Sequence, residues 1–240
     1  MDFQDVRAFH VKFDLPVDDG QPELMSADQL RFRLGFMNEE LDEYADAVEK
    51  ENLVEAADAL FDFVYVVFGT VLFLRLGNGY PFNTTRPSFN SVHVEALRLG
   101  YITSIPRSPQ FLSANLRDLM ELRMRLEVDH FHWAHDSEEP SALPLSISHL
   151  WNAARAAYLT AVFMGIPWER CWRHVQAANM AKTRAASDGS DSKRGSSWDV
   201  IKPPGWRAPD LAIAQELISA GSMFHHDVLR EAENASRPKA

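Results

Sequence analysis

The sequence predicts an all-α fold, an antiparallel helical bundle, and three observations lead to this class. Apolar residues recur at spacings of three and four along most of the chain, as they do on one face of a helix. Capping-box patterns, which are typical of helix starts, precede the two longest periodic segments. No segment shows the apolar–polar alternation of a half-buried strand over a useful length. We expect the 240 residues to form a single domain (1–240) with a substantial core.

The first three predicted helices cover residues 2–13, 26–50 and 52–76. The first has apolar residues along one side, and a connector with Pro and Gly follows it. Because only a short turn separates the second and third helices, we expect them to pack as an antiparallel hairpin. The capping-box pairs that begin them are Ser26 with Gln29 and Asn52 with Glu55.

A long insertion is expected at about residues 77–147. Its first part is broken by Gly, Pro, Asn and Thr and contains one short periodic piece, Val92–Leu99. An amphipathic helix is expected over residues 113–129, and a loop rich in His, Glu and Pro over 130–145.

After the insertion the helical pattern resumes. Helices are expected over residues 148–164 and 168–184, separated by a sharp Gly-Ile-Pro turn. Residues 185–200 are rich in Ser, Gly and Asp and are expected to form a mobile loop. A short helix over residues 210–220 ends the periodic part of the chain.

The composition favours an intracellular protein that binds neither nucleic acid nor membrane. The hydrophobic share of 46% and the charged share of 24% are ordinary for a globular protein, and the net charge of −10 repels nucleic acid. The N-terminus lacks the layout of a signal peptide, and the apolar run Phe63–Leu74 is too short to span a bilayer comfortably. The single cysteine, Cys171, is compatible with a reducing compartment, so we expect a cytoplasmic location.

Two acidic patterns lie at the end of one predicted helix and at the start of the next. The first contains Glu39, Glu40 and Glu43, and the second contains Glu55 and Asp58. Residues one turn apart share a helix face, and the hairpin brings the two patterns together. A carboxylate facing a packed interior is costly unless a positive charge compensates it, and the next helix supplies no Lys or Arg before its end. Oxygen ligands at this density suit Mg²⁺, or Mn²⁺.

A less specific interpretation exists for some of these residues. Residues 39–51 could form a solvated acidic face, and Glu55 could serve only the capping box. Asp58 does not fit such an account, because apolar residues lie on or near its own helix face. Asp62 shares this difficulty, although a partner on another helix could bond to it. Together the carboxylates favour a metal site.

The spacing E-E-x-x-E followed by E-x-x-D at the head of an apolar helix resembles the all-α nucleoside triphosphate pyrophosphohydrolases. This superfamily includes MazG-like enzymes and phosphoribosyl-ATP pyrophosphohydrolase. Three further stretches, in the same order, resemble the MazG-like branch: residues 6–13, 165–182 and 202–206. The long insertion departs from the family pattern and leaves the substrate range and the form of the dimer open.

The resemblance implies Mg²⁺-dependent hydrolysis of a nucleoside triphosphate, of a deoxy- or non-standard type, to the monophosphate and pyrophosphate. It implies that Glu40, Glu43, Glu55 and Asp58 are metal ligands and that Glu39 orients or deprotonates the attacking water. It also implies a homodimer or higher homo-oligomer, which we further expect because an apolar third helix needs more cover than one hairpin partner gives.

Substrate phosphates need local positive charge on a chain with a net charge of −10. Asn179 and Lys182 share a helical face and could hold one ligand, while the resemblance adds Lys202 and Trp206 as binding residues. Lys193 and Arg194 lie in the loop predicted to be mobile. They could close over the phosphates, although a plain loop is the simpler interpretation.

Two other functional classes compete with the hydrolase interpretation. A carboxylate-bridged di-iron protein would use Glu-x-x-His twice, and the chain has it once, at Glu127 and His130. The stretch with His130, His132 and His135 could bind a transition metal, although histidines in a loop are often incidental. A non-enzymatic helical adaptor would leave the buried aspartates unexplained.

Overall fold

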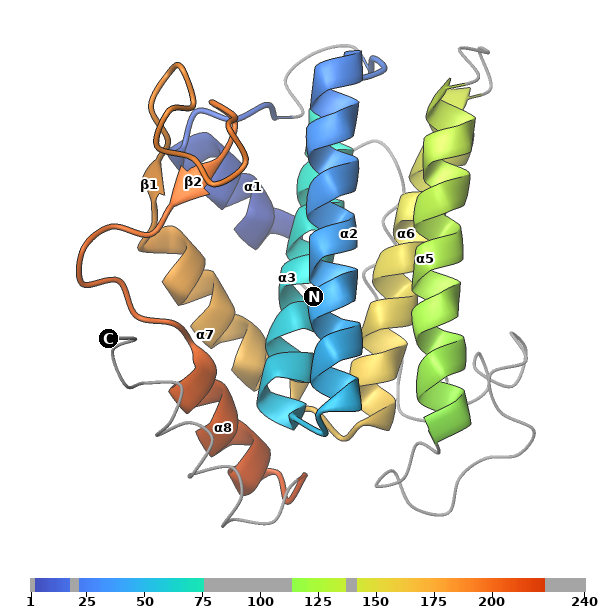
Figure 1. The fold of residues 1–240 in the computed structure, drawn as a ribbon, viewed down its shortest axis with the longest axis vertical. Coiled ribbons are helices and arrows are strands. Elements are labelled where there is room, and N and C mark those ends of the chain that lie inside the picture. The colour runs from blue at the N-terminus through green and yellow to red at the C-terminus, as the bar shows by residue number, and fades with distance from the viewer. Residues whose placement is uncertain (1–2, 18–21, 76–113, 137–141, 223–240) are drawn as a thin grey trace.

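The computed structural model describes residues 3–17, 22–75, 114–136 and 142–222. These residues form seven helices and one pair of very short strands (Figure 1). The predicted all-α class is confirmed. Residues 76–113, which include the predicted piece Val92–Leu99, lie outside the described residues.

Four long helices form the centre of the fold and lie side by side in Figure 1. They are α2 (Ala27–Glu49), α3 (Leu53–Phe73), α5 (Ala114–Asp136) and α6 (Ala142–Phe163). Contacts between α2 and α3, α3 and α6, α6 and α5, and α5 and α2 close a four-membered ring of helices. Part of the predicted insertion, α5, is therefore one wall of the bundle.

The α2–α3 hairpin forms as its local signals predict. The Ser26 hydroxyl accepts a hydrogen bond from the Gln29 backbone N–H at 3.3 Å, and the Gln29 side chain accepts one from the Ser26 N–H at 2.9 Å. Asn52 caps α3 by accepting a hydrogen bond from the Glu55 N–H at 3.1 Å. These caps satisfy backbone donors at the first turn of each helix, where no carbonyl is available within the helix.

Helix α3 is the centre of the core. By length and composition alone it could cross a membrane, but 89% of its most apolar stretch is buried inside the structure, as in the core helix of a globular protein. It contacts α1, α2, α6, α7 and α8. The predicted need of α3 for more cover than its hairpin partner gives is therefore met within one chain, by α1, α6, α7 and α8.

Three shorter helices pack against one side of the bundle. Helix α1 (Phe3–Lys12) contacts α3 and α7 (Trp168–Met180), and α8 (Asp210–Ser219) also contacts both. The Tyr65 hydroxyl of α3 donates to the Gln176 side chain of α7 at 2.8 Å. This bond fixes the C-terminal part of the chain beside the α2–α3 hairpin.

Two local expectations are corrected. Residues 130–136 continue α5 and are not a loop, because no Gly or Pro interrupts them and Phe131, Ala134 and His135 continue the buried face. Helix α7 ends at Met180 and not near residue 184. Thr183–Arg184 (β1) instead pairs antiparallel with Val200–Ile201 (β2), which closes the loop between them. Two-residue strands are too short to produce a readable alternation.

Candidate active site

The two acidic patterns meet where the C-terminal half of α2 lies beside the first turns of α3. Glu40 is 5% exposed, and its pKa is raised well above the ordinary range by burial and then by the charges of Asp62, Glu43 and Asp58. The pKa of Glu43 is also raised, by burial and by the charges of Glu39 and Asp62. Glu40, Glu43 and Asp58 therefore lie close enough for their charges to interact.

Asp58 is the carboxylate in the least favourable surroundings. Its Oδ1 atom is buried and has no hydrogen-bond partner in the described part of the chain. Burial, followed by the charges of Asp62, Asp210 and Glu55, raises its pKa well above the ordinary value, and Lys182 only partly offsets this. An unpaired buried carboxylate oxygen is costly unless a further group bonds to it.

Asp62 completes the cluster and was not assigned to the metal site from the sequence. Its charge acts on Glu40, Glu43 and Asp58. The signal was available, because Asp62 lies four residues after Asp58 on the same helix and therefore on the same face.

The cluster fits a hard divalent cation. It offers carboxylate oxygens, which Mg²⁺ and Mn²⁺ prefer, and burial together with the neighbouring carboxylates raises the pKa of Glu40 and Asp58 in spite of Arg194 and Lys182. The Asp58 Oδ1 atom, which has no hydrogen-bond partner among the described residues, is available as a metal ligand.

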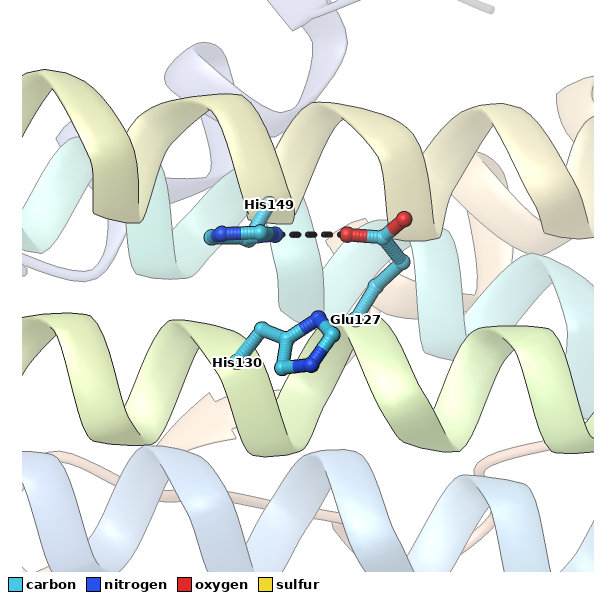
Figure 2. Close-up of side chains that lie close together, drawn as sticks. All are labelled: Glu127, His130 and His149. Carbon is cyan, nitrogen blue, oxygen red and sulfur yellow. Dashed lines mark hydrogen bonds and ion pairs between the residues drawn. The ribbon is translucent and has the colours of Figure 1, made fainter.

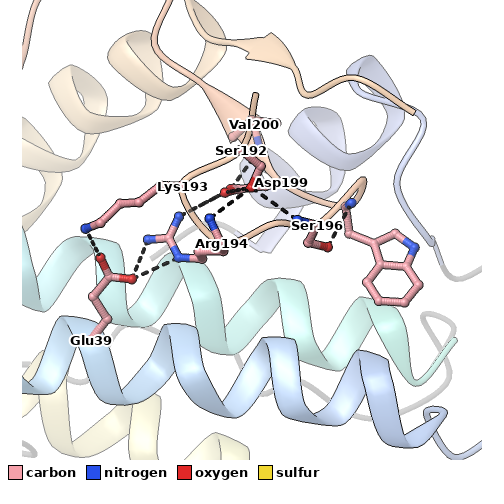
Figure 3. Close-up of polar contacts among 8 residues, drawn as sticks. Glu39, Ser192, Lys193, Arg194, Ser196, Asp199 and Val200 are labelled. Carbon is pink, nitrogen blue, oxygen red and sulfur yellow. Dashed lines mark hydrogen bonds and ion pairs between the residues drawn. The ribbon is translucent and has the colours of Figure 1, made fainter. Parts of the chain in front are cut away.

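Glu39 is paired with cations of the loop between β1 and β2 (Figure 3). Lys193 Nζ lies 2.5 Å from Glu39 Oε1, and Arg194 Nη2 lies 2.7 Å from Oε2. Partial burial alone would raise the pKa of Glu39, but the hydrogen bonds and charges of Lys193 and Arg194 outweigh it and hold the pKa below its ordinary value. Glu39 is therefore ionised at neutral pH.

Asp199 anchors the same loop (Figure 3). It is 3% exposed, accepts a hydrogen bond from the Ser192 hydroxyl at 2.8 Å and pairs with Arg194 at 3.2 Å. The Arg194 guanidinium also lies 3.7 Å from the ring centroid of Phe36. The loop thus presents Arg194 to the acidic end of α2, which differs from the interpretation as a plain loop.

The predicted phosphate-binding residues lie around one indole ring. Lys202 Nζ is 4.4 Å and Lys182 Nζ is 5.8 Å from the ring centroid of Trp206. The Trp206 indole N–H donates to the Ala178 carbonyl at 2.8 Å, which fixes the ring on α7. Lys182 acts on the charge of Asp58 and Lys202 on that of Glu43, so both cations adjoin the acidic cluster.

The family model of phosphoribosyl-ATP pyrophosphohydrolase matches residues 6–76, which include both acidic patterns. This family is part of the MazG-like all-α nucleoside triphosphate pyrophosphohydrolase superfamily, so residues 6–76 are similar to that superfamily. Enzymes of this family are typically metal-dependent, and the match supports a nucleotide pyrophosphohydrolase activity in general terms. No curated protein and no solved structure matches the chain.

A small cavity of about 50 Å³ lies between the matched segment and the C-terminal part of the chain, beside the acidic cluster. Asp62 lines it together with Asn179, which is 5% exposed, and Lys182. Phe9 and His10 of α1 form another wall. The cavity is therefore lined by a carboxylate on one side, and by an amide, an ammonium group and aromatic rings on the others.

A buried basic pair lies against this cavity. His10 hydrogen-bonds through Nδ1 to the Pro16 carbonyl at 2.6 Å, and burial together with the charge of Arg33 lowers its pKa to about 3. Burial, followed by the charge of Arg194, lowers the pKa of Arg33 to about 9. His10 is therefore neutral at physiological pH, while Arg33 stays charged and donates from Nε to the Thr70 hydroxyl at 3.0 Å.

Proposed function

We propose that this chain hydrolyses a nucleoside triphosphate, of a deoxy- or non-standard type, to the monophosphate and pyrophosphate with the help of Mg²⁺. The observation that carries the proposal is the buried Asp58 oxygen, which has no partner in the described part of the chain and lies in a cluster of carboxylates with raised pKa values. This cluster lies inside the segment that the pyrophosphohydrolase family model matches. The choice of nucleotide type rests on the family resemblance alone.

The metal would be held by Glu40, Glu43, Glu55 and Asp58. We add Asp62 as a fifth candidate ligand, because its charge acts on Glu40, Glu43 and Asp58. Bound Mg²⁺ would neutralise charge on the phosphate oxygens and lower the pKa of a water molecule. Mn²⁺ would suit the same oxygen donors.

Glu39 is our candidate for the residue that orients the attacking water. Its low pKa keeps it ionised, so that both carboxylate oxygens can accept hydrogen bonds. The same low pKa makes it a weak base while Lys193 and Arg194 hold it. We infer that Glu39 first positions the water and gains basicity when a substrate phosphate draws these two cations away.

Lys182 and Lys202 would bind the phosphates beside the cluster, and Trp206 would fix the positions of their ammonium groups. Asn179 lines the adjoining cavity and would donate its amide N–H to the substrate. On a chain with a net charge of −10 these local cations are needed to hold a triphosphate.

A panel of ribo- and deoxynucleoside triphosphates, each incubated with the protein and Mg²⁺, tests this function. We expect at least one to yield monophosphate and pyrophosphate, and chelation of the metal to stop the reaction. Release of diphosphate and phosphate, or no turnover of any member, would contradict the proposal.

We also propose a homodimer, which the family resemblance implies, although α3 is covered within one chain and does not itself require a partner. The support is a row of exposed apolar residues on α5 at helical spacing, among the residues that the structure describes: Leu119, Leu122, Leu126 and Trp133. We expect light scattering to give a dimer mass that Leu126→Glu lowers. The matched change at the exposed Leu211 of α8 should leave it unaltered. A monomeric wild-type protein would refute this assembly.

A further inference from the structure

A second polar cluster lies between α5 and α6, and the proposed function does not use it. Glu127 of α5 has a side chain only 2% exposed. Its Oε2 atom lies 2.7 Å from Nδ1 of His149 on α6, and its Oε1 atom forms an ion pair with Arg123. A buried carboxylate is thus aimed at an imidazole on the neighbouring helix.

A second imidazole completes the group (Figure 2). His130 follows Glu127 by three residues on α5, so both occupy one helix face. Its ring centroid lies 5.1 Å from that of His149. One donor atom from each of Glu127, His130 and His149 lies within 4.8 Å of the other two.

We propose that Glu127, His130 and His149 bind a single transition-metal ion of the Zn²⁺ class. Two imidazoles and one carboxylate are donors that zinc accepts, whereas Mg²⁺ prefers sites built of oxygen alone. Tetrahedral ligands around zinc are roughly 3.4 Å apart, given bond lengths near 2.1 Å. Zinc binding would therefore require the 2.7 Å contact between Glu127 and His149 to open and the other donor atoms to draw together. His130 is exposed, so water can reach the site.

The surroundings support one ion in this place. Arg123 occupies the Glu127 oxygen that faces away from His149, so it can orient the carboxylate while the other oxygen binds metal. The other histidines of α5 have different partners. His132 lies 3.6 Å from Asp136, and His135 accepts a hydrogen bond from the Met25 N–H at 3.0 Å. The alternative grouping of His130, His132 and His135 is therefore not formed, and His149 supplies the second imidazole.

A metal ion here would link α5 to α6 across the bundle. The site would stabilise the packing of these two helices independently of nucleotide hydrolysis, because the acidic cluster lies on α2 and α3. The inference therefore does not rest on the proposed function.

Zinc titration of the full chain tests the site, with a chromophoric chelator as competitor and excess Mg²⁺ to fill sites built of oxygen alone. We expect one Zn²⁺ per chain, and we expect His130→Ala and His149→Ala each to weaken zinc binding by about 10-fold or more. His132→Ala is the matched control, because this exposed histidine lies on the same helix but outside the cluster, and it should keep the wild-type affinity.

Thermal unfolding provides a second readout. Added zinc should raise the melting temperature of the wild-type chain and of His132→Ala, but not that of His130→Ala. Because His130 is exposed, its truncation leaves the core packing intact, so a lost response reports on the metal. Absence of bound zinc, unchanged affinity in both cluster variants, or an equal loss in His132→Ala would overturn the proposal.

Discussion

Replacing Asp58 by Asn should have opposite effects on stability and on activity. In the metal-free protein the Asp58 carboxylate lies among like charges, and its buried Oδ1 atom has no hydrogen-bond partner among the described residues. Asparagine keeps the shape, removes the charge and adds an N–H that can donate to a neighbouring carboxylate such as Asp62.

The expected size of the stability effect follows from these contacts. An unsatisfied buried polar group costs about 1–3 kcal/mol, and more when it is charged. The metal-free Asp58→Asn variant should therefore be more stable than the wild type by about 1–3 kcal/mol at neutral pH. Each kcal/mol raises the melting temperature of a chain of this size by roughly 2–4 °C. Loss of a metal ligand should lower the rate with Mg²⁺ by about 100-fold or more.

Calorimetry in chelator and turnover assays in Mg²⁺ measure the two effects on the same preparations. Asp46→Asn is the control, because this aspartate is exposed on α2 and its ion pair with Lys50 contributes at most about 1 kcal/mol. A metal-free Asp58→Asn protein less stable than the wild type would show that the carboxylate is already compensated. Undiminished turnover would show that Asp58 is not a ligand.

Three further outcomes are expected. Arg194→Ala should raise the pKa of Glu39 in the free enzyme, so the acidic limb of the kcat/KM–pH profile should move to higher pH; an unmoved limb would show that Glu39 does not take part in catalysis. Gly69→Ala should lower the unfolding free energy in urea by about 1–3 kcal/mol, because its Cβ would lie 2.7 Å from Nη2 of Arg33, whereas Gly35→Ala has open space and should not. Metal-free stability should fall as pH rises above about 4, because carboxyls with raised folded-state pKa values bind more protons folded than unfolded; a rise in stability would refute this.

The hairpin and its carboxylates could be predicted because their signals are local. Ser26 and Asn52 determine where α2 and α3 begin, and helical spacing then fixes which acidic residues share a face. Asp58 could be singled out because apolar neighbours on its own helix exclude a solvated role.

Contacts between segments that are distant in the sequence could not be predicted from such local signals. Glu39 meets Arg194 across 155 residues, and nothing in a loop rich in Ser and Gly indicates which cation will reach α2. His149 meets Glu127 only because α6 packs on α5, which depends on the register of two helices in three dimensions. The predicted end of this helix at residue 129 was wrong, because a His-rich composition does not end a helix that no Gly or Pro interrupts.

Hydrolysis in ¹⁸O-labelled water tests the central claim most directly. For a nucleoside triphosphate that the protein turns over with Mg²⁺, mass spectrometry locates the label in the products. Attack at the α-phosphorus predicts ¹⁸O in the nucleoside monophosphate and unlabelled pyrophosphate. Label in pyrophosphate, or label in inorganic phosphate released beside a diphosphate, would contradict the account.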